Sequence, residues 1–554
     1  MSTRISTSSS RPSSNPLSRI TRRAPWLQRR GSARWLLLLA AAAGLFVAAL
    51  DAYAVVTLLP KMLFDLDVPV DRIEQATPIV SGFLAGYIVV MPLIGLASDV
   101  HGRTAVYLGA LAAFALGSIF TASAAYTGEP PYGLIGLPWL VAGRVLQGVG
   151  GGALVPVALA LAADLFPAGG RSPAIGAISA IQETGSVLGP LYGAVLAAWA
   201  ETLGSWRFVF WANLPLALAC AAGFVVAQRR LSPMSGQRTQ QPERGEVPPA
   251  DWLGAVLLGI GLALLVVALY PDDPAHRAVS AFFWPAGVGA VVALGAWSWR
   301  QASDLAPVIP RRLLRSRVFL GASLANLLAG GGLMVALVDI PLMGRGVFNL
   351  TQLDSALLLS RFMVAVPLGA ILGGLAARRL GGRWVAAAGM LAAAGFFALL
   401  AGWNEHELAR RLVGIREADL VLAGGGLGFG LVIAPLATAV LDLAQPGRHG
   451  LAASLVVLVR TLGMLLGLSA LTAFGLSRFY QLSNAGPALR LIPGSPDFAA
   501  QKAAFDARVT QALVAEYHSI FLIAAALCVS GAVVAGLALV DSARSTAGRT
   551  TASR

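Results

Sequence analysis

Residues 181–190 read Ile-Gln-Glu-Thr-Gly-Ser-Val-Leu-Gly-Pro, and residues 459–467 read Val-Arg-Thr-Leu-Gly-Met-Leu-Leu-Gly. When the two pairs of glycines, four residues apart in each stretch, are superposed, Glu183 and Arg460 fall one position apart on equivalent helices. The two copies predict a chain built from two related halves. A charge at the bilayer centre costs about 2.5–3.5 kcal/mol on insertion scales, so an acid and a base kept there indicate a path for protons or substrate.

The composition is that of a polytopic membrane protein. Of 554 residues, 56% are hydrophobic and 12% are charged, whereas a soluble protein averages about 25% charged residues. A helix needs about 20 apolar residues to cross the hydrocarbon core of a bilayer. On that criterion the sequence predicts fourteen spans, which are 35–59, 76–98, 105–126, 138–162, 174–199, 207–227, 252–270, 280–299, 318–340, 354–377, 384–402, 419–441, 450–476 and 518–540.

The spans group as six, two and six, which predicts an all-α fold of two pseudo-symmetric six-helix bundles. A second pair of similar stretches supports the repeat, because residues 140–156 (LVAGRVLQGVGGGALVP) resemble residues 420–435 (LVLAGGGLGFGLVIAP). Parallel halves with a site near the midplane between them are a recurring transporter plan. The predicted parts are a disordered cytoplasmic N-terminus (1–34), the N-terminal bundle (35–227), a cytoplasmic linker (228–251), two inserted helices (252–299), a cytoplasmic loop (300–317), the C-terminal bundle (318–540) and a cytoplasmic tail (541–554).

The longest predicted outer loop, residues 478–517, contains a second helix signal. Ser495-Pro496-Asp497 has the cap and the proline of a helix start. The apolar residues that follow then share one helical face. Two interpretations remain open, a helix packed on the outer surface or a platform for a partner or for lipid.

The net charge of +14 follows membrane topology and does not imply a nucleic-acid partner. Arginines cluster before residue 35, at 311–317 and at 378–383, all on one side of the membrane if the N-terminus is cytoplasmic. This positive-inside bias predicts that both termini lie in the cytoplasm. The sequence carries no phosphate-binding loop, metal-ligand set or nucleophile arrangement. We therefore expect no enzyme activity and no cofactor, with the energy supplied by a proton gradient.

Residues 95–103 (GLASDVHGR) resemble the loop between helices 2 and 3 of the major facilitator superfamily. Asp99, Gly102 and Arg103 match that pattern, and Val100 and Thr104 depart from it. The resemblance implies a conformational latch on the cytoplasmic face, in which Asp99 meets an arginine and the positive end of a nearby helix. The two departures predict a weaker or rewired latch. The alternative is a loop that only sets topology.

Residues 185–194 (GSVLGPLYGA) resemble the helix 5 motif of antiporters, with Ala194 in place of the final glycine. Small residues four apart let helix backbones approach closely. We therefore expect this stretch to seal against the C-terminal half and to favour export. The residues that match the antiporter motif are Gly185, Gly189, Pro190 and Gly193.

Two further runs, residues 50–60 (LDAYAVVTLLP) and 206–215 (WRFVFWANLP), resemble signatures of the fourteen-helix drug:proton antiporters. Residues 144–148 (RVLQG) resemble the superfamily's helix 4 motif, whose arginine is linked to proton transfer. For Arg144 a structural ion pair inside the bundle is the alternative. For Asp51 the alternative is a residue at a water-filled helix end.

The narrowest resemblance is to an actinobacterial branch that exports triacylglycerols and other lipophilic compounds and works with a periplasmic lipoprotein. It is carried by QETGSVLGPLYG (182–193), LMVALVDIPLMGRGV (333–347) and GRHGLAASLVVLVRTLGM (447–464). The resemblance implies Asp51, Glu183 and Arg460 as a functional charged trio in a bacterial inner membrane protein, which we expect to be a monomer. The same three positions stand out independently as charges inside predicted spans.

These observations favour a proton-coupled exporter of lipophilic molecules that works by alternating access. A buried carboxylate holds a proton more tightly than one in water, and a nearby arginine opposes that effect. If rocking of the halves makes and breaks a contact between Glu183 and Arg460, proton binding would follow conformation. Few Asn or Gln side chains lie at midplane, which favours a lipid or drug cargo over a sugar. The alternatives are a multidrug:proton antiporter without a lipid role and a non-transporting scaffold or sensor.

Overall fold

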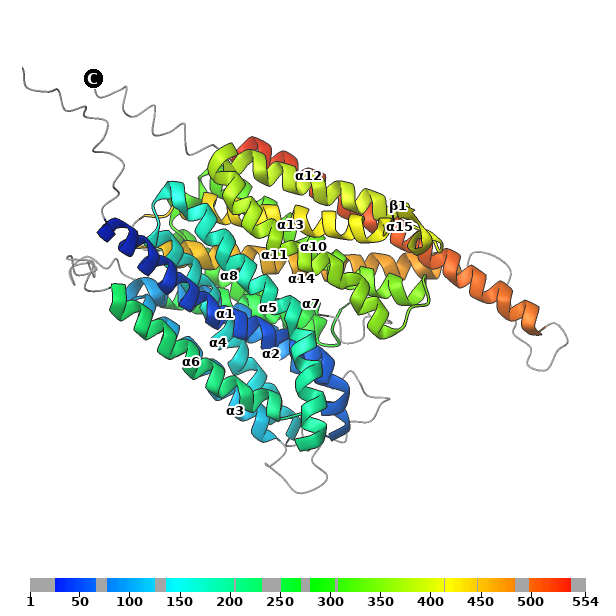
Figure 1. The fold of residues 1–554 in the computed structure, drawn as a ribbon, viewed down its shortest axis with the longest axis horizontal. Helices are drawn as coiled ribbons and strands as arrows, with labels where there is room; N and C mark the ends of the chain where they lie inside the picture. Colours follow the sequence, from blue (N-terminus) through cyan, green and yellow to red (C-terminus); the bar gives the residue numbers. More distant parts are fainter. Residues whose placement is uncertain are drawn as a thin grey trace, which may run out of the picture.

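The computed structural model describes residues 25–65, 77–124, 136–203, 206–231, 251–270, 279–303, 307–412, 414–445, 447–483 and 498–539. These residues form fifteen α-helices and one short antiparallel hairpin. The predicted cytoplasmic tail, most of the predicted linker and most of the predicted N-terminal segment lie outside the described residues. The molecule is a long assembly of roughly aligned helices (Figure 1).

The helices follow the predicted order of six, two and six. The first six are α1 (Pro25–Asp65), α2 (Thr77–His101), α3 (Arg103–Ser123), α4 (Gly136–Leu165), α5 (Ala168–Leu203) and α6 (Phe208–Leu231). The insert is α7 (Trp252–Leu269) and α8 (Phe283–Ser303). The second half contains a one-turn helix α9 (Arg311–Leu314), then α10 (Arg317–Gly346), α11 (Gln352–Leu380), α12 (Gly382–Ala401), α13 (Glu417–Leu441), α14 (His449–Ser483) and α15 (Phe498–Ala538). A 3₁₀ turn (Glu407–Ala409) and the strands β1 (Arg411–Leu412) and β2 (Ile415–Arg416) connect α12 to α13.

Each predicted span coincides with one of these helices. Twelve of the described helices are long and apolar enough to cross a membrane. The other two that match predicted spans, α5 and α8, are not among the twelve, because polar residues lower their hydropathy. The coarse prediction of an all-helical membrane protein is therefore confirmed, and the full count of fourteen spans stays a prediction.

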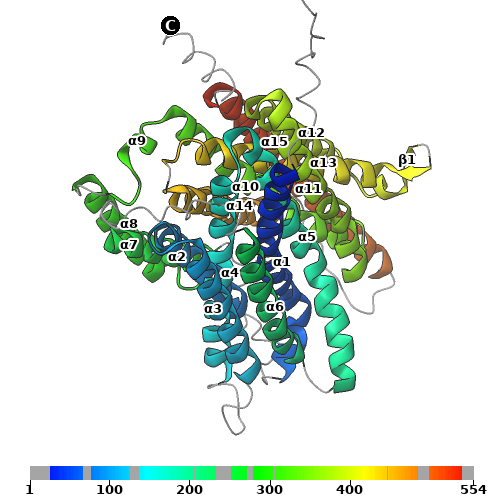
Figure 2. The same cartoon turned by 60° about the vertical axis from the view of Figure 1, so that its left-hand side comes forward.

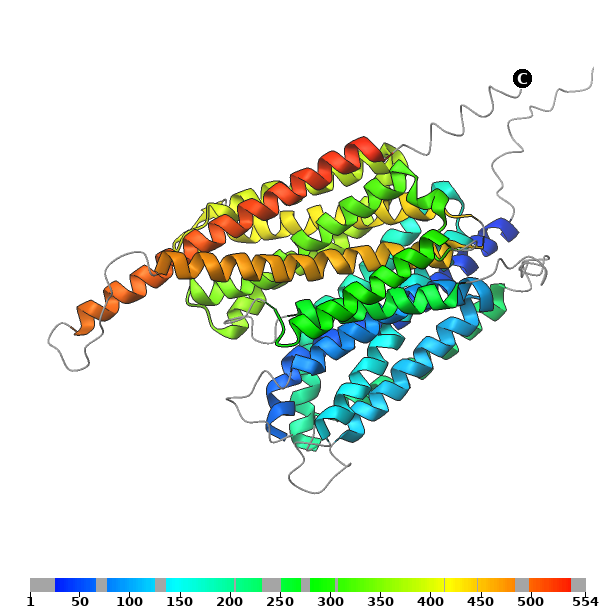
Figure 3. The ribbon, with the colours of Figure 1, turned by 180° about the vertical axis from the view of Figure 1, so that it is seen from behind.

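The structure differs from the prediction at both ends of the helical part. α1 begins at Pro25, inside the segment 1–34 that was expected to be disordered. The helix predicted within residues 478–517 and the predicted span 518–540 belong to one continuous helix, because α15 runs through 41 residues. Residues 498–530 contain neither glycine nor proline, so nothing in the sequence ends the helix there. The expected helix start at 495–497 falls outside the described residues, and α15 projects past the bundle (Figure 3).

The glycine-dense helices α4 and α13 occupy equivalent places in the two halves. A Cβ on Gly148 of α4 would clash with the carbonyl oxygen of Phe83 in α2. In the same way, a Cβ on Gly426 of α13 would clash with the carbonyl oxygen of Phe362 in α11. Glycines at these positions let the backbones touch, which explains why the sequence repeats this stretch.

The two bundles meet at the end of the molecule where α1 begins and α15 ends, and they diverge toward the opposite end (Figures 1 and 3). α5 contacts α11 across this junction, and α2 contacts α14. The contact is close, because a Cβ on Gly176 would meet the Ala370 carbonyl and one on Gly374 would meet the Ser172 carbonyl. The insert α7–α8 lies on one flank beside α2 (Figure 2).

Candidate functional site

Asp51, in the middle of α1, is sealed inside the N-terminal half with none of its surface exposed. Its Oδ2 atom lies 2.9 Å from Nη1 of Arg144 on α4, which is 1% exposed. The guanidinium also stacks on the Phe83 ring, 4.5 Å from its centroid. This geometry excludes the water-filled helix end considered for Asp51. For Arg144 it places the side chain in an ion pair inside the bundle.

Two amide side chains complete the surroundings of the Asp51 carboxylate. Asn213 of α6 donates to Oδ1 at 2.6 Å, and Gln147 of α4 donates to Oδ2 at 3.3 Å. Both amides also donate to the hydroxyl of Ser118 on α3. Sequence reasoning singled out neither amide, although Gln147 lies within the helix 4 run and Asn213 within the 206–215 run. The helix 4 run and the 206–215 run, together with the helix 1 run, therefore meet at one carboxylate.

Glu183 and Arg460 form a second, partly exposed ion pair, and it joins the two halves. Oε1 of Glu183 on α5 lies 3.3 Å from Nη2 of Arg460 on α14. The two side chains are 15% and 17% exposed, so both retain some access to solvent. The expected trio is thus divided, because Asp51 pairs within one half and Glu183 pairs across both.

Close helix packing fixes the positions of both partners. A Cβ on Gly330 of α10 would clash with the Arg460 carbonyl, and one on Gly463 of α14 would clash with the Leu327 carbonyl. On the other side of the pair, Tyr53 of α1 hydrogen-bonds to Ser186, one turn from Glu183. Each charged side chain is therefore carried by a helix held firmly to its own half.

The expectation that the helix 5 glycines seal against the C-terminal half is wrong. A Cβ on Gly185 would lie 2.6 Å from the Phe46 carbonyl oxygen, and one on Gly193 would lie 2.7 Å from that of Ala54, both on α1. A Cβ on Gly189 would lie 2.6 Å from Cβ of Tyr53 on the same helix. The glycine face thus packs α5 onto its neighbour in the N-terminal half, and Pro190 is exposed on another face.

The latch residues join the halves at the end where the bundles meet. The Asp99 carboxylate accepts hydrogen bonds from the backbone N–H groups of Gly450 (2.9 Å) and Leu451 (3.0 Å) in the first turn of α14. Nη1 of Arg103 lies 2.7 Å from Asp99, and its Nε lies 3.0 Å from Asp164 of α4. A carboxylate on the free N–H groups of a helix start is a favourable arrangement. We call Asp99, Arg103, Asp164 and the first turn of α14 the latch.

Gly102 separates the two helices that carry the latch charges. Its φ of +88° lies in the left-handed region, which glycine adopts without a steric cost. Thr104, which departs from the superfamily pattern, donates to Gln228 of α6 at 2.8 Å. This position is therefore tied within the N-terminal half and does not contribute a charge to the latch.

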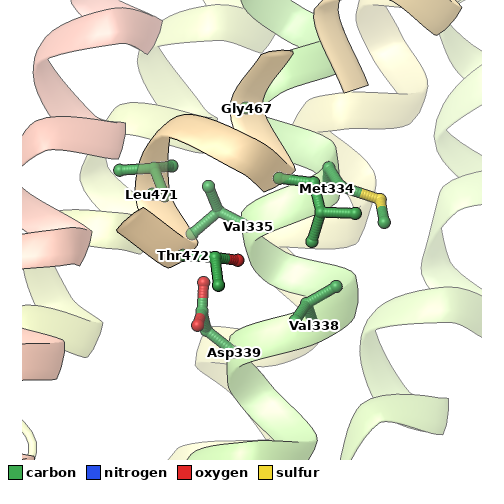
Figure 4. Close-up of a pocket in the computed structure, with 8 residues that line it drawn as sticks. Met334, Val335, Val338, Asp339, Gly467, Leu471 and Thr472 are labelled. Atoms are coloured by element: carbon green, nitrogen blue, oxygen red, sulfur yellow. The ribbon is translucent and has the colours of Figure 1, made fainter. Parts of the chain in front are cut away.

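A further acid in a membrane helix escaped the sequence reasoning. Asp339 of α10 points into a small pocket toward Thr472 of α14 (Figure 4). It lies within the run 333–347 that carries the narrow resemblance, and it is the acid of the predicted span 318–340. An acid inside a predicted apolar span is the signal that could have identified Asp339. The sequence reasoning passed over it because it concentrated on the charges in the repeated stretches around Glu183 and Arg460.

Residues 41–468 match the profile of the Major Facilitator Superfamily. The chain belongs to that superfamily. Two relatives are named triacylglyceride transporter. The one from Mycolicibacterium hassiacum is 40% identical over 519 residues, which cover 92% of each chain. The one from Mycobacterium tuberculosis strain H37Rv is 40% identical over 495 residues, covering 88% of this chain and 91% of that protein.

Solved structures of the superfamily share the fold. The proton:xylose symporter XylE has a TM-score of 0.56 at 14% identity, with 90% of this chain and 95% of that chain covered. The human organic anion transporter MFSD10 has a TM-score of 0.55 at 17% identity, with 89% and 99% covered. The chain is thus a multi-pass membrane protein of a transporter superfamily. Within its described residues, no group of three His, Cys, Asp or Glu side chains could hold a metal ion.

Proposed function

We propose that this protein is a proton-coupled exporter of lipophilic molecules, with triacylglycerols as natural cargo, and that it works by alternating access. The observation that carries the proposal is the Glu183–Arg460 ion pair, because each partner belongs to a different half. Movement of one bundle against the other changes the distance between these two charges. The pair is therefore placed where a change of conformation and a change of protonation can be linked.

In the arrangement described here, the Arg460 guanidinium balances the charge of the Glu183 carboxylate. Separation of the halves would leave that carboxylate among apolar side chains without its counter-ion, which is costly unless it takes up a proton. A proton that enters from the outer side can thus release Glu183 from Arg460. Release of this proton on the inner side lets Glu183 and Arg460 pair again. One such cycle would move a proton inward as the cargo site turns outward.

The cargo is argued from the relatives and from the chemistry of the chain. The two relatives described above are named for triacylglycerides, and they align with nearly the whole chain. The 56% hydrophobic composition leaves few polar groups to replace the water around a hydrophilic cargo. Hydrophobic drugs share this chemistry, and they form the second cargo class of the proposal.

The proposed setting is a bacterial cytoplasmic membrane with both termini inside. In that topology α5 and α8 are also spans, which gives fourteen, and the latch lies at the cytoplasmic face. Glu183 is one of the polar residues that lower the hydropathy of α5. Because we assign it a role in transport, the low hydropathy of α5 does not argue against a membrane span. We further propose a monomer that hands its cargo to a periplasmic lipoprotein and uses no bound cofactor.

The experiment is transport into proteoliposomes under an imposed proton gradient. A fluorescent triacylglycerol and a cationic dye would be compared for the wild type, Glu183→Gln and the matched control Glu405→Gln, an exposed acid at the outer end. We expect gradient-driven triacylglycerol movement in the wild type and the control, and its loss in Glu183→Gln. Transport that ignores both the gradient and Glu183→Gln would overturn proton coupling. Movement of the dye alone would identify a drug antiporter.

A further inference from the structure

The latch contains a histidine that belongs to the opposite half. His449 is the first residue of α14, and it is buried where α14 meets α4. Its Nδ1 atom lies 2.6 Å from Oδ1 of Asp164, the carboxylate that also accepts from Arg103. Because an ionised carboxylate only accepts hydrogen bonds, Nδ1 carries the hydrogen. His449 therefore adds a side-chain contact between the halves beside the backbone contacts of Asp99.

Other charged groups surround this histidine from each neighbouring helix. Asp99 on α2 is compensated by Arg103 on α3 at 2.7 Å. Asp442, at the end of α13, is compensated by Arg171 on α5 at 2.7 Å. Burial raises the pKa of the Asp442 carboxyl, and the Arg171 guanidinium opposes that rise. Arg448 directly precedes His449, just before α14 begins.

Asp164 differs from the other two acids because it is shared. It receives Arg103 on one oxygen and His449 on the other. The three acids are paired with only two arginines, because Arg103 is shared by Asp99 and Asp164 while Arg171 pairs with Asp442. A proton on the imidazole makes the donor as well as the acceptor of this hydrogen bond charged, which strengthens it. The positive end of α14 opposes that proton, but the carboxylate at 2.6 Å is the nearer charge.

We infer that His449 is a positioning residue that couples the latch to the acidity of the cytoplasm. A histidine gains its proton as the pH falls between about 8 and 5. Because Nδ1 already carries a hydrogen, the added proton binds Nε2. In the latched arrangement the resulting imidazolium lies 2.6 Å from the Asp164 carboxylate, and opening of the latch separates the two charges. Protons therefore stabilise the latched state, and an alkaline cytoplasm releases it. The inference rests on the proposed alternating access, and it means that acid brought in by the transport cycle closes the gate.

The test measures latch closure directly, without cargo and without a gradient. Spin labels would be placed at Ala168→Cys on α5 and Leu380→Cys on α11, which are both exposed at the latch end. The background would carry Cys220→Ala and Cys528→Ala, which remove the two native thiols. Double electron–electron resonance spectroscopy in nanodiscs would give the fraction of molecules with a short distance between the two labels, at pH values between about 5.5 and 8.

We expect the ratio of short to long distances to rise about fivefold from the alkaline to the acidic end in the wild type. The response should vanish in His449→Gln and in Asp164→Asn, and His449→Arg should give short distances throughout. His101→Gln, an exposed histidine outside the latch, is the matched control and should keep the full response. A pH response that survives in His449→Gln, or is missing from the wild type, would overturn the inference.

A separate arm distinguishes this inference from the proposed function. The same distances would be measured in Glu183→Gln, which removes the acid that pairs with Arg460 across the two halves. The response should persist there, because it depends on His449. If it disappears with Glu183→Gln and survives in His449→Gln, the acid is the sensor and the role given to His449 is wrong. Failure of cargo transport in proteoliposomes leaves these distances unaffected.

Discussion

Two ion pairs between helices in the described part of this protein are built in opposite ways. Asp51 and Arg144 are 0% and 1% exposed, lie 2.9 Å apart and sit within one half. Glu183 and Arg460 are 15% and 17% exposed, lie 3.3 Å apart and sit on different halves. Three side chains from two helices donate to Asp51, whereas Glu183 and Arg460 depend mainly on each other.

This difference separates two uses of charge inside a membrane. A fully enclosed pair with every oxygen satisfied resists change, because removing either partner leaves a buried charge uncompensated. A pair between two bodies that retains some solvent access can be taken apart without unfolding either body. The first pair therefore stabilises one bundle, whereas formation of the second pair depends on the relative position of the two bundles.

The largest effect is expected from Arg144→Ala. Removal of the guanidinium leaves Asp51 buried without a cation, which costs about 3–5 kcal/mol and should leave little folded protein. Unfolding of the detergent-solubilised protein, followed by intrinsic fluorescence, measures the loss. The double variant Asp51→Asn with Arg144→Ala should recover part of the stability. A wild-type unfolding midpoint in the single variant would contradict the structural role of the pair.

The next effect should come from Gly185→Val, which tests whether the helix 5 glycines act within one half. The new side chain would press on the Phe46 carbonyl of α1, and overpacking of this kind costs about 1–3 kcal/mol. The counterpart is Gly95→Val, whose side chain would press on Gly450 and Ser454 across the junction. We expect Gly95→Val to open the latch in spin-label distances while each half stays folded. An equal loss of stability in both variants would contradict the distinction between Gly185, which packs within one half, and Gly95, which packs across the junction.

A smaller effect is expected from Asp99→Asn. The amide keeps the size of the carboxylate but loses its charge toward the start of α14, an interaction worth about 0.3–1 kcal/mol. The latched population should fall by a few-fold, measured by the spin-label distances between Ala168→Cys and Leu380→Cys. Thr104→Ser is the control, because it retains the hydroxyl that donates to Gln228. Unchanged distances in Asp99→Asn would show that its two backbone hydrogen bonds do not hold the halves.

The smallest change in stability is expected from Glu183→Gln. Its pair with Arg460 is partly exposed, so the free energy of unfolding should change by less than about 1 kcal/mol. The variant should nevertheless lose gradient-driven transport. Parallel measurement of the unfolding midpoint and of proteoliposome transport separates the two quantities. A loss of stability as large as that of Arg144→Ala would mean that both pairs are structural.

Much of the architecture could be predicted because the signals are local. Span positions follow from apolar length, and the repeat of α4 in α13 follows from glycines that a helix partner requires. The partner of Asp51 could not be predicted, because Arg144 is 93 positions away and only the fold brings it there. The helix 5 glycines were misassigned for a related reason. A four-residue spacing defines a helix face, but it does not say which neighbour that face meets.

The distance along the chain between Asp51 and its partners also has a consequence in time. Arg144 follows Asp51 by 93 positions and Asn213 follows it by 162. A ribosome adds about 5–20 residues per second, so roughly 5–20 s separate the synthesis of the acid from that of its cation. Throughout that interval α1 holds a carboxylate that hydrocarbon does not tolerate. The nascent helix must therefore remain beside the insertion machinery until α4 emerges.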